Sequence, residues 1–260
     1  MDKDIIRINN LSFSYKNVPV FEGLSLNVEK NSFTTIVGSN KSGKTTLIKL
    51  ITGILPSKDA IEINANKKQI GVFVGDIVDQ FLFDDVYHEL AFTMENLCYP
   101  ESVIKERIAE VTNLLKIDDL VDKKIESLST AEKARVLFAV SIIHKPTLLL
   151  LDNPFSMLSK DDRMFMNNII MKLVKREHMT VLMTSNDLAD ALYADYLYVL
   201  DEGKVIVEGP PLKVMQEDTL LNRYNISIPF MVDLSNKLMF YNLLDDVIVD
   251  MDRMVDKLWK

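Results

Sequence analysis

The feature that most constrains the fold is a glycine-rich loop between an apolar strand and a helix. Residues 38–46 read Gly-Ser-Asn-Lys-Ser-Gly-Lys-Thr-Thr and match the pattern G-x-x-x-x-G-K-[ST]. Residues 33–37 before them are apolar or β-branched, and residues 47–51 after them are typical of a helix. Such a loop curls its backbone N–H groups around phosphate oxygens, and the N-terminus of the following helix adds its dipole. The pattern therefore predicts a nucleotide-phosphate loop.

Residues of this loop and of a later strand are expected to bind Mg-ATP. Lys44 is expected to reach the β- and γ-phosphates, and the Thr45 hydroxyl is expected to coordinate Mg²⁺. Asp152 ends a second apolar strand and is expected to hold the same ion through water, although it could instead cap the next helix. The residues expected to contact the nucleotide are Gly38, Ser39, Asn40, Lys41, Ser42, Gly43, Lys44, Thr45 and Thr46.

Short β-type runs alternate with longer helical patterns along the chain, which is typical of an α/β fold with parallel strands. Three runs are nearly all apolar or β-branched, as expected for central strands covered on both faces. A hairpin turn is predicted at residues 201–204, which read Asp-Glu-Gly-Lys. The expected strands are residues 5–9, 25–29, 33–37, 61–64, 70–74, 147–151, 180–184, 196–200 and 205–208.

Helical periodicity divides the rest of the chain into an insertion and a tail. A helical subdomain, at about residues 90–146, is expected within a sheet domain that spans 1–220. Residues 221–260 are expected to be helical, and this short extension is expected either to pack on the main body or to dimerise. The apolar face predicted for the extension consists of Val247, Met251, Met254, Val255 and Leu258.

Composition limits the partners of the chain. The 260 residues carry a net charge of −8 without a clustered basic face, which argues against binding nucleic acid. Cys98 is the one cysteine, which excludes an internal disulfide and a cysteine metal cluster. The N-terminus does not resemble a signal peptide, and the apolar runs are too short to span a bilayer. Any membrane role is therefore expected to be peripheral, through another protein.

The order of motifs resembles ATP-binding cassette (ABC) proteins over nearly the whole chain. Residues 11–15, Leu-Ser-Phe-Ser-Tyr, are similar to the strand whose aromatic residue stacks on adenine in that family, so the resemblance implies this role for Tyr15. A solvent-facing strand tyrosine is the alternative. Residues 128–132, Leu-Ser-Thr-Ala-Glu, occupy the place of the LSGGQ signature, and Ser129 is implied to contact ATP held by a second chain. The implied fold is a P-loop NTPase cassette with a RecA-like sheet core, an antiparallel β part and a helical subdomain.

Within that family the chain is most similar to the ATPase subunits of energy-coupling factor (ECF) transporters. The similarity rests on residues 79–81, 89–97 and 228–230. In that group two ATPases pair head to tail at the cytoplasmic face of the membrane and drive an integral membrane scaffold that imports vitamins or transition-metal ions. The resemblance implies an ABC-family ATPase subunit onto which such a scaffold docks near residues 76–95. An acidic loop that is merely solvated remains the alternative for that segment.

Several positions depart from the family pattern. Gly75 replaces a glutamine, Asn153 replaces the glutamate that polarises water, Asn186 replaces the switch histidine, and Ser159 replaces the D-loop aspartate. An amide can orient a water but cannot accept its proton. We therefore expect a chain that binds Mg-ATP, hydrolyses it slowly, and pairs with a different, intact ATPase rather than with itself. A nucleotide-binding pseudo-ATPase scaffold and a cytosolic ABC protein unconnected to transport are the alternatives.

Overall fold

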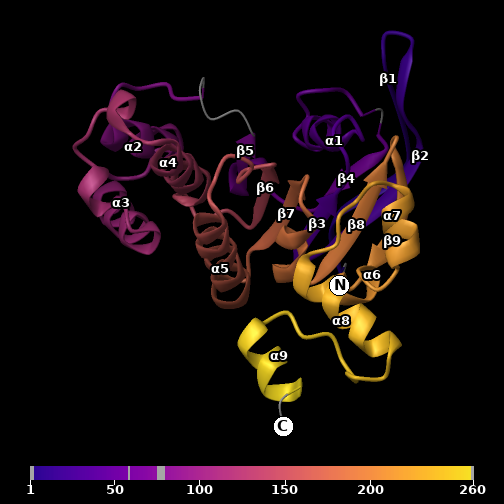
Figure 1. Cartoon of the computed structure of the whole chain (residues 1–260). Coiled ribbons are helices and arrows are strands. Elements are labelled where there is room, and N and C mark those ends of the chain that lie inside the picture. The colour runs from indigo at the N-terminus through magenta and orange to yellow at the C-terminus, as the bar shows by residue number, and fades with distance from the viewer. Residues whose placement is uncertain (1–2, 58, 75–79, 259–260) are drawn as a thin grey trace.

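The computed structural model describes residues 3–57, 59–74 and 80–258, which form two sheets surrounded by helices (Figure 1). The larger sheet has the order β5-β6-β7-β3-β8-β9, and the smaller has the order β2-β1-β4. In the larger sheet only β9 runs antiparallel to its neighbour, whereas the smaller sheet is antiparallel throughout. The strands are β1 (Asp4–Tyr15), β2 (Val18–Glu29), β3 (Phe33–Val37), β4 (Ile61–Ile63), β5 (Ile70–Val74), β6 (Leu148–Asp152), β7 (Thr180–Ser185), β8 (Tyr196–Asp201) and β9 (Lys204–Gly209).

Every strand expected from the sequence is present, but the first two are longer than predicted. β1 continues to Tyr15 and β2 begins at Val18, so the two form a long hairpin. Their pairing register shifts at positions that resemble strand breaks in the sequence, where Asn10 has φ 50° and Gly23 has φ 82°. Bulges of this kind let one strand continue through residues that disrupt the alternating pattern.

The carboxyl ends of three parallel strands lie at one edge of the larger sheet. Val37 at the end of β3 is paired with Ser185 on β7, and Asp152 at the end of β6 is paired with Thr184 on the same strand. The loops that follow β3, β6 and β7 therefore meet, although the first is more than a hundred residues from the other two in sequence. Ligands of open α/β sheets bind at such an edge.

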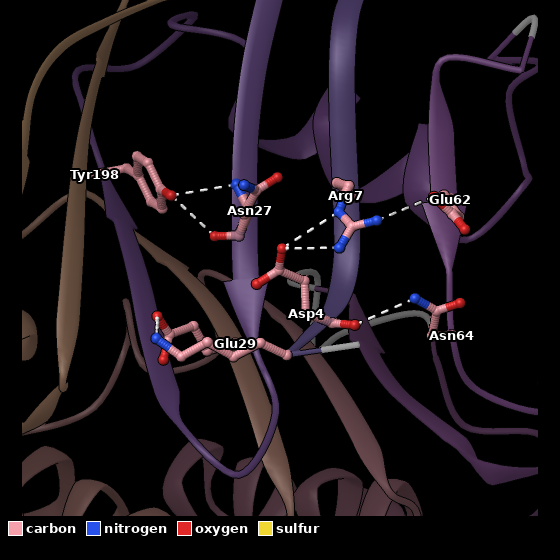
Figure 2. Close-up of polar contacts among 8 residues, drawn as sticks. Asp4, Arg7, Asn27, Glu29, Glu62, Asn64 and Tyr198 are labelled. Atoms are coloured by element: carbon pink, nitrogen blue, oxygen red, sulfur yellow. Dashed lines mark hydrogen bonds and ion pairs between the residues drawn. The ribbon is translucent and has the colours of Figure 1, made fainter. Parts of the chain in front are cut away.

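Polar contacts fix the smaller sheet against the larger one and against its own neighbours (Figure 2). The Tyr198 hydroxyl of β8 donates to the Asn27 carbonyl of β2 at 2.9 Å and accepts from the Asn27 amide at 3.2 Å. Burial raises the pKa of Tyr198 to about 12, so this hydroxyl stays protonated in neutral solution. Within the smaller sheet, Arg7 of β1 contacts Asp4 and Glu62. The Tyr198 contacts therefore join β2 to β8, and the contact of Arg7 with Glu62 joins β1 to β4.

The helical subdomain, α2 to α4, forms an arm beside β5, and α5 lies between this arm and the larger sheet (Figure 1). The helical periodicity predicted for this part of the chain is seen in α3, which buries Ile104, Ile108, Val111 and Leu115. The α-helices are α1 (Lys44–Ile51), α2 (Val86–Asn96), α3 (Glu101–Leu115), α4 (Thr130–Ile142), α5 (Lys160–Glu177), α6 (Pro211–Val214), α7 (Asp218–Arg223), α8 (Phe230–Phe240) and α9 (Met251–Leu258). Short 3-10 helices span Lys67–Gln69, Asp118–Leu120, Ile125–Ser127 and Leu188–Tyr193. None of the described helices is long and apolar enough to cross a membrane.

The predicted turn at residues 201–204 is confirmed, since β8 ends at Asp201 and β9 begins at Lys204. Both central residues have positive φ, 43° at Glu202 and 74° at Gly203, which is the backbone combination favoured in two-residue hairpins. The Gly203 N–H donates to the Ser42 carbonyl at 3.1 Å. The turn therefore packs directly against the glycine-rich loop.

The C-terminal extension, which the sequence predicts to be helical, consists of three short helices with breaks between them. Residues 224–229 and 241–250 separate three short helices and are not helical. Pro229 and the positive φ of Asn225 and Asn242 explain the breaks, because none of them suits a helix interior. Val247 lies in a break, and of the predicted face only Met254 is buried, while the exposed members are Met251, Val255 and Leu258.

The start of the extension packs on the main body. Leu221, Ile226 and Val232 belong to the same buried cluster as Val37 and Leu188. Val37 directly precedes the glycine-rich loop, so this part of the extension is continuous with the core behind that loop.

Candidate functional site

The glycine-rich loop connects β3 to α1 in the way that the sequence predicts. Gly43 caps α1 with φ 106°, and a Cβ there would come within 2.8 Å of the Phe21 ring. A Cβ on Gly38 would come within 2.1 Å of the Leu200 carbonyl oxygen. Both positions therefore require glycine, because no larger side chain fits between the loop and its neighbours.

The Lys44 ammonium is held by the loop itself. Only 6% of this residue is exposed, and its Nζ donates to the carbonyls of Gly38 and Ser39 at 2.8 Å and to the Ser42 hydroxyl at 3.2 Å. Burial lowers the pKa of Lys44 to about 8, and the negative charge of Asp152 opposes this shift. A buried cation that is satisfied mainly by neutral carbonyls gains from an approaching anion.

The residues at the ends of β6 and β7 are connected through one hydroxyl. The Thr184 hydroxyl donates to the buried Asp152 carboxylate at 2.7 Å and accepts from the backbone N–H of Asn153 at 3.0 Å. Asn153 has φ 47°, a left-handed conformation that asparagine tolerates better than most residues. Asp152 is not a helix cap, because α5 is capped by Ser159.

Most of the predicted site residues line one cleft of about 320 Å³, which we call the phosphate cleft. It contains residues of the loop, the acid at the end of β6, and the two asparagines that follow β6 and β7. Its lining residues are Val20, Asn40, Lys41, Gly43, Lys44, Thr45, Thr46, Asp152, Asn153 and Asn186.

The phosphate cleft fits Mg²⁺ together with a phosphate chain. Thr45 and Asp152 offer a hydroxyl and a carboxylate in one cleft, and hard oxygen ligands of this kind suit Mg²⁺. The Lys44 ammonium in the same cleft supplies positive charge for the phosphates.

A second cleft of about 450 Å³, which we call the adjoining cleft, borders the first. Gly38, Ser39, Asn153 and Asn186 line it together with residues that the sequence analysis did not single out. These additional residues come from the ends of β3 and β7, from the loop after β6, from the start of α5, from the segment after β7 and from the C-terminal extension. They are Val37, Ser156, Arg163, Ser185, Asp187, Leu188, Asn225, Ile226 and Ser227.

Comparison with known families identifies this arrangement. A family model described as ABC transporter matches residues 21–156, which are just over half of the chain. The chain belongs to the ABC transporter family. This confirms the predicted cassette fold, in which the glycine-rich loop and the acid after β6 face one cleft.

Relatives of the cassette carry ECF transporter names. It is 30% identical over 262 residues to the energy-coupling factor transporter ATP-binding protein EcfA1 of Mycoplasma genitalium, with 96% of this chain and 95% of that protein covered. It is 29% identical over 264 residues to the protein EcfA of Pediococcus pentosaceus, with 96% and 94% covered. The similarity to ECF ATPase subunits that was predicted from the sequence is therefore confirmed.

A solved structure has the same fold. The cbiO1 protein of Clostridium perfringens, described as part of the ABC transporter complex cbiONQ, matches the cassette with a TM-score of 0.77 at 25% identity. The match covers 90% of this chain and 99% of that one.

Four of the predicted positions lie away from both clefts or outside the described residues. Tyr15 is 43% exposed at the end of β1, packs edge-on against Phe13, and lines neither cleft. Its adenine role stays a prediction. Gly75, Asp76 and Asp79 lie outside the described residues, and the expectations for them also remain predictions.

Ser129 lies in the cassette's helical subdomain, where it caps α4. Its hydroxyl and its backbone N–H both donate to the Glu132 carboxylate, at 2.7 and 2.8 Å. These two hydrogen bonds lower the pKa of Glu132. The acid of the altered signature therefore lies over the N-terminus of α4 and holds the donors of its own serine.

The acids of the predicted docking segment have different structural roles. Glu89 is buried and accepts from the backbone N–H groups of Leu82 and Phe83 at 2.9 Å, so it shapes the segment from inside. Asp85 caps α2 by accepting from the His88 amide at 3.0 Å, as the alternative of an acidic helix start suggests for that residue. The exposed residues of the described segment include Asp84, Leu82 and Glu95.

Proposed function

We propose that this chain is the ATP-binding subunit of an ABC-type importer of the ECF kind, and that its own site binds Mg-ATP but hydrolyses it slowly. The full-length similarity to EcfA proteins and the similar structure from a transporter complex support the first part. The second part rests on one observation. Asn153 and Asn186, two neutral amides, stand in the phosphate cleft beside Lys44, Thr45 and Asp152.

Binding uses the charged and hydroxyl groups that the cleft retains. Lys44 exchanges neutral carbonyl partners for phosphate oxygens, and such charge-assisted hydrogen bonds are stronger. Thr45 and Asp152 would hold the magnesium ion, which neutralises charge on the phosphates. The Thr184 hydroxyl keeps the Asp152 carboxylate oriented toward this position.

The proposed slow hydrolysis follows from the lack of a carboxylate at position 153, where a general base is expected. Among the described residues that line the phosphate cleft, Asp152 is the one carboxylate, and it is engaged by Thr184. Asn153 can orient a water but cannot act as a general base, which is worth about 10²–10⁴-fold in rate. Tight binding of ground-state ATP does not lower the barrier to its cleavage.

The partners follow from the same proposal. A head-to-tail partner that carries the missing catalytic groups, rather than a second copy of this chain, would complete the pair. In such a pair Ser129 faces ATP on the partner, and Glu132 competes with phosphate for the serine donors. An integral membrane scaffold would dock near residues 76–95 and hold the subunit peripherally at the cytoplasmic face.

The proposed hydrolysis defect is tested by restoring the acid. Asn153→Glu is expected to raise turnover of the purified chain by about 10²-fold or more, because it supplies the missing general base. Asn153→Gln is the matched control, since it has the same length and bears the same backbone strain at φ 47° without the charge. Hydrolysis by the unchanged chain at about 1 s⁻¹ or faster contradicts the proposal.

Turnover of the assembled complex distinguishes the importer from a pseudo-ATPase scaffold. This second function is favoured by the neutral side chains of Asn153 and Asn186. The importer couples hydrolysis to membrane components that copurify with the chain. A complex that binds ATP and organises those components without consuming ATP is the scaffold. Copurification of no membrane protein contradicts both readings and leaves a cytosolic role.

Scaffold docking is tested best at Asp84. Reversing Asp85 would remove the cap of α2, whereas the Asp84 side chain is exposed and, among the described contacts, Asp84 is engaged through its backbone carbonyl, by the Ile125 backbone N–H. Asp84→Lys is expected to weaken assembly with a basic scaffold helix, and reversal of the scaffold charge is expected to restore it. Unchanged assembly excludes this contact.

A further inference from the structure

The first two turns of α5 lie between the two clefts and the helical subdomain. Figure 1 shows α5 with α4 on one side and β7 on the other. Asp162 and Arg163 are neighbours in its first turn, and Phe165 follows. Adjacent residues on a helix point in different directions, so this short segment can hold two structures at once. We call Asp162, Arg163 and Phe165 the α5 junction.

One side of the α5 junction holds the helical subdomain. Asp162 accepts from the Arg135 guanidinium of α4 at 2.6 Å. The Arg135 guanidinium also lies over the Phe165 ring, 4.9 Å from its centre, and the Lys116 ammonium at the end of α3 lies 5.3 Å from the same ring centre. About a quarter or less of the Arg135 and Asp162 side chains is exposed, 22% and 24%, so solvent screens this pair less than a surface ion pair.

The other side holds the segment that carries Asn186. Arg163 donates to Asp190 at 2.7 Å and contacts Asp187 at 3.0 Å. Asp190 is only 5% exposed and also accepts from the Ser185 hydroxyl at 2.6 Å. A buried carboxylate with several donors fixes the backbone around it, because any displacement leaves a buried charge unpaired. Asn186 therefore lies between Asp187, which contacts Arg163 of α5 directly, and Ser185, which is connected to Arg163 through Asp190.

We propose that the α5 junction transmits nucleotide-dependent displacement of residues 185–190 to the helical subdomain, with Asp162, Arg163 and Arg135 as positioning residues. This inference rests on the proposed function, since it needs Mg-ATP in the phosphate cleft. The junction converts movement beside Asn186 into movement of α4, because packed charged contacts keep discrete arrangements rather than deforming continuously. Arg163 lines the adjoining cleft and contacts residues 187 and 190, whereas its neighbour Asp162 contacts Arg135 of the subdomain, so the two sets of contacts meet in one helical turn.

The chain itself also connects the larger sheet to the helical subdomain, from β5 to α2. That route passes through Gly75, which has no side chain with which to contact a metal ion or a phosphate. The α5 junction is the route for which the described residues provide charged side-chain contacts on both sides.

The native cysteine allows a direct test in the full chain. Cys98 is exposed just after α2 in the helical subdomain, and Lys30 is exposed in the turn between β2 and β3. A donor and an acceptor dye on Cys98 and on Lys30→Cys report the position of the subdomain relative to the sheets. Mg-ATP binding is measured on the same samples by calorimetry.

The proposal predicts a change in energy transfer on adding Mg-ATP that depends on the junction. Arg135→Met is expected to reduce this change to less than about half, whereas the Kd for Mg-ATP changes by less than about threefold, because Arg135 lines neither cleft. Arg135→Lys, which keeps the charge near Asp162, is expected to recover part of the change. Lys105→Met removes the exposed pair with Glu101 on α3 and is expected to leave the change intact.

Three results would overturn the transmission proposal while leaving the proposed function standing. They are an unchanged signal in Arg135→Met, an equal loss in Lys105→Met, and no nucleotide-dependent signal in the unsubstituted junction although calorimetry detects binding. Absence of Mg-ATP binding by calorimetry is a failure of the proposed function itself. Melting temperatures of the variants identify any that are unfolded, and Arg135→Lys then carries the test.

Discussion

The two walls of the phosphate cleft differ in what they retain. The loop wall carries Gly43, where a Cβ would meet the Phe21 ring, and the buried Lys44. The second wall, at the ends of β6 and β7, carries Asp152 together with Asn153 and Asn186, two neutral amides at positions where the sequence resemblance implies an acid and a histidine. The loop wall supplies a positive charge, whereas the strand-end wall offers mainly neutral hydrogen-bonding groups.

Under the proposed function, holding ATP and splitting it depend on separate parts of one site. The loop wall depends on a backbone conformation that requires glycine and on one buried cation. The strand-end wall depends on the chemistry of single side chains, which can be exchanged without disturbing the fold. Asn153 keeps its backbone hydrogen bond to Thr184 although its side chain is neutral.

Removing the Lys44 ammonium should have the largest effect on Mg-ATP binding. Lys44→Ala is expected to weaken Mg-ATP binding by about 100-fold, because a buried charge-assisted hydrogen bond is worth about 1.5–3 kcal/mol. Lys49→Ala in the last turn of the same helix is the control and should bind normally. Calorimetry measures both, and normal binding by Lys44→Ala would break the comparison.

Titrating the same cation should have the next largest effect. The pKa of Lys44 is about 8, and phosphate binds the protonated form, so affinity is highest below pH 8 and falls as the proton is lost above it. Between pH 7 and pH 9 the affinity for Mg-ATP should fall about tenfold. Lys44→Arg stays charged throughout and should remove most of this pH dependence, even if it binds less tightly.

The strand-end wall should respond more weakly. Thr184→Val removes the hydroxyl shared by Asp152 and Asn153, and is expected to cost about 1–2 kcal/mol of stability and roughly threefold in Mg-ATP affinity. Thr180→Val is a matched control on β7, because its buried hydroxyl accepts only the distant Asn31 amide in the described contacts. It should lose stability without losing affinity. Equal affinity losses in both variants would mean that the wall has no local role.

Much of this architecture can be predicted from the sequence, because its signals are local. The glycine pattern, the apolar central strands and the turn at 201–204 each depend on neighbouring residues. The meeting of Asp152 with Asn186 was also predictable, since parallel strands bring their carboxyl ends to one edge.

The misses share a physical cause, which is that tertiary contacts override local pattern. The long β1–β2 hairpin persists through bulges that resemble strand ends. Glu89 belongs to an acidic segment that the sequence suggests is exposed, but it is buried and accepts from the backbone N–H groups of Leu82 and Phe83. The charged contacts of Arg163 with Asp187 and Asp190 connect residues more than twenty positions apart, and no spacing rule reveals them.

A single-turnover experiment on the isolated chain tests the central claim most directly. The chain is saturated with Mg-ATP, unbound nucleotide is removed, and the bound nucleotide is identified after increasing times. The predicted result is stoichiometric nucleotide that remains mainly ATP for many minutes. Recovery of bound ADP within seconds, or of no nucleotide at all, would contradict a site that holds ATP without the means to cleave it.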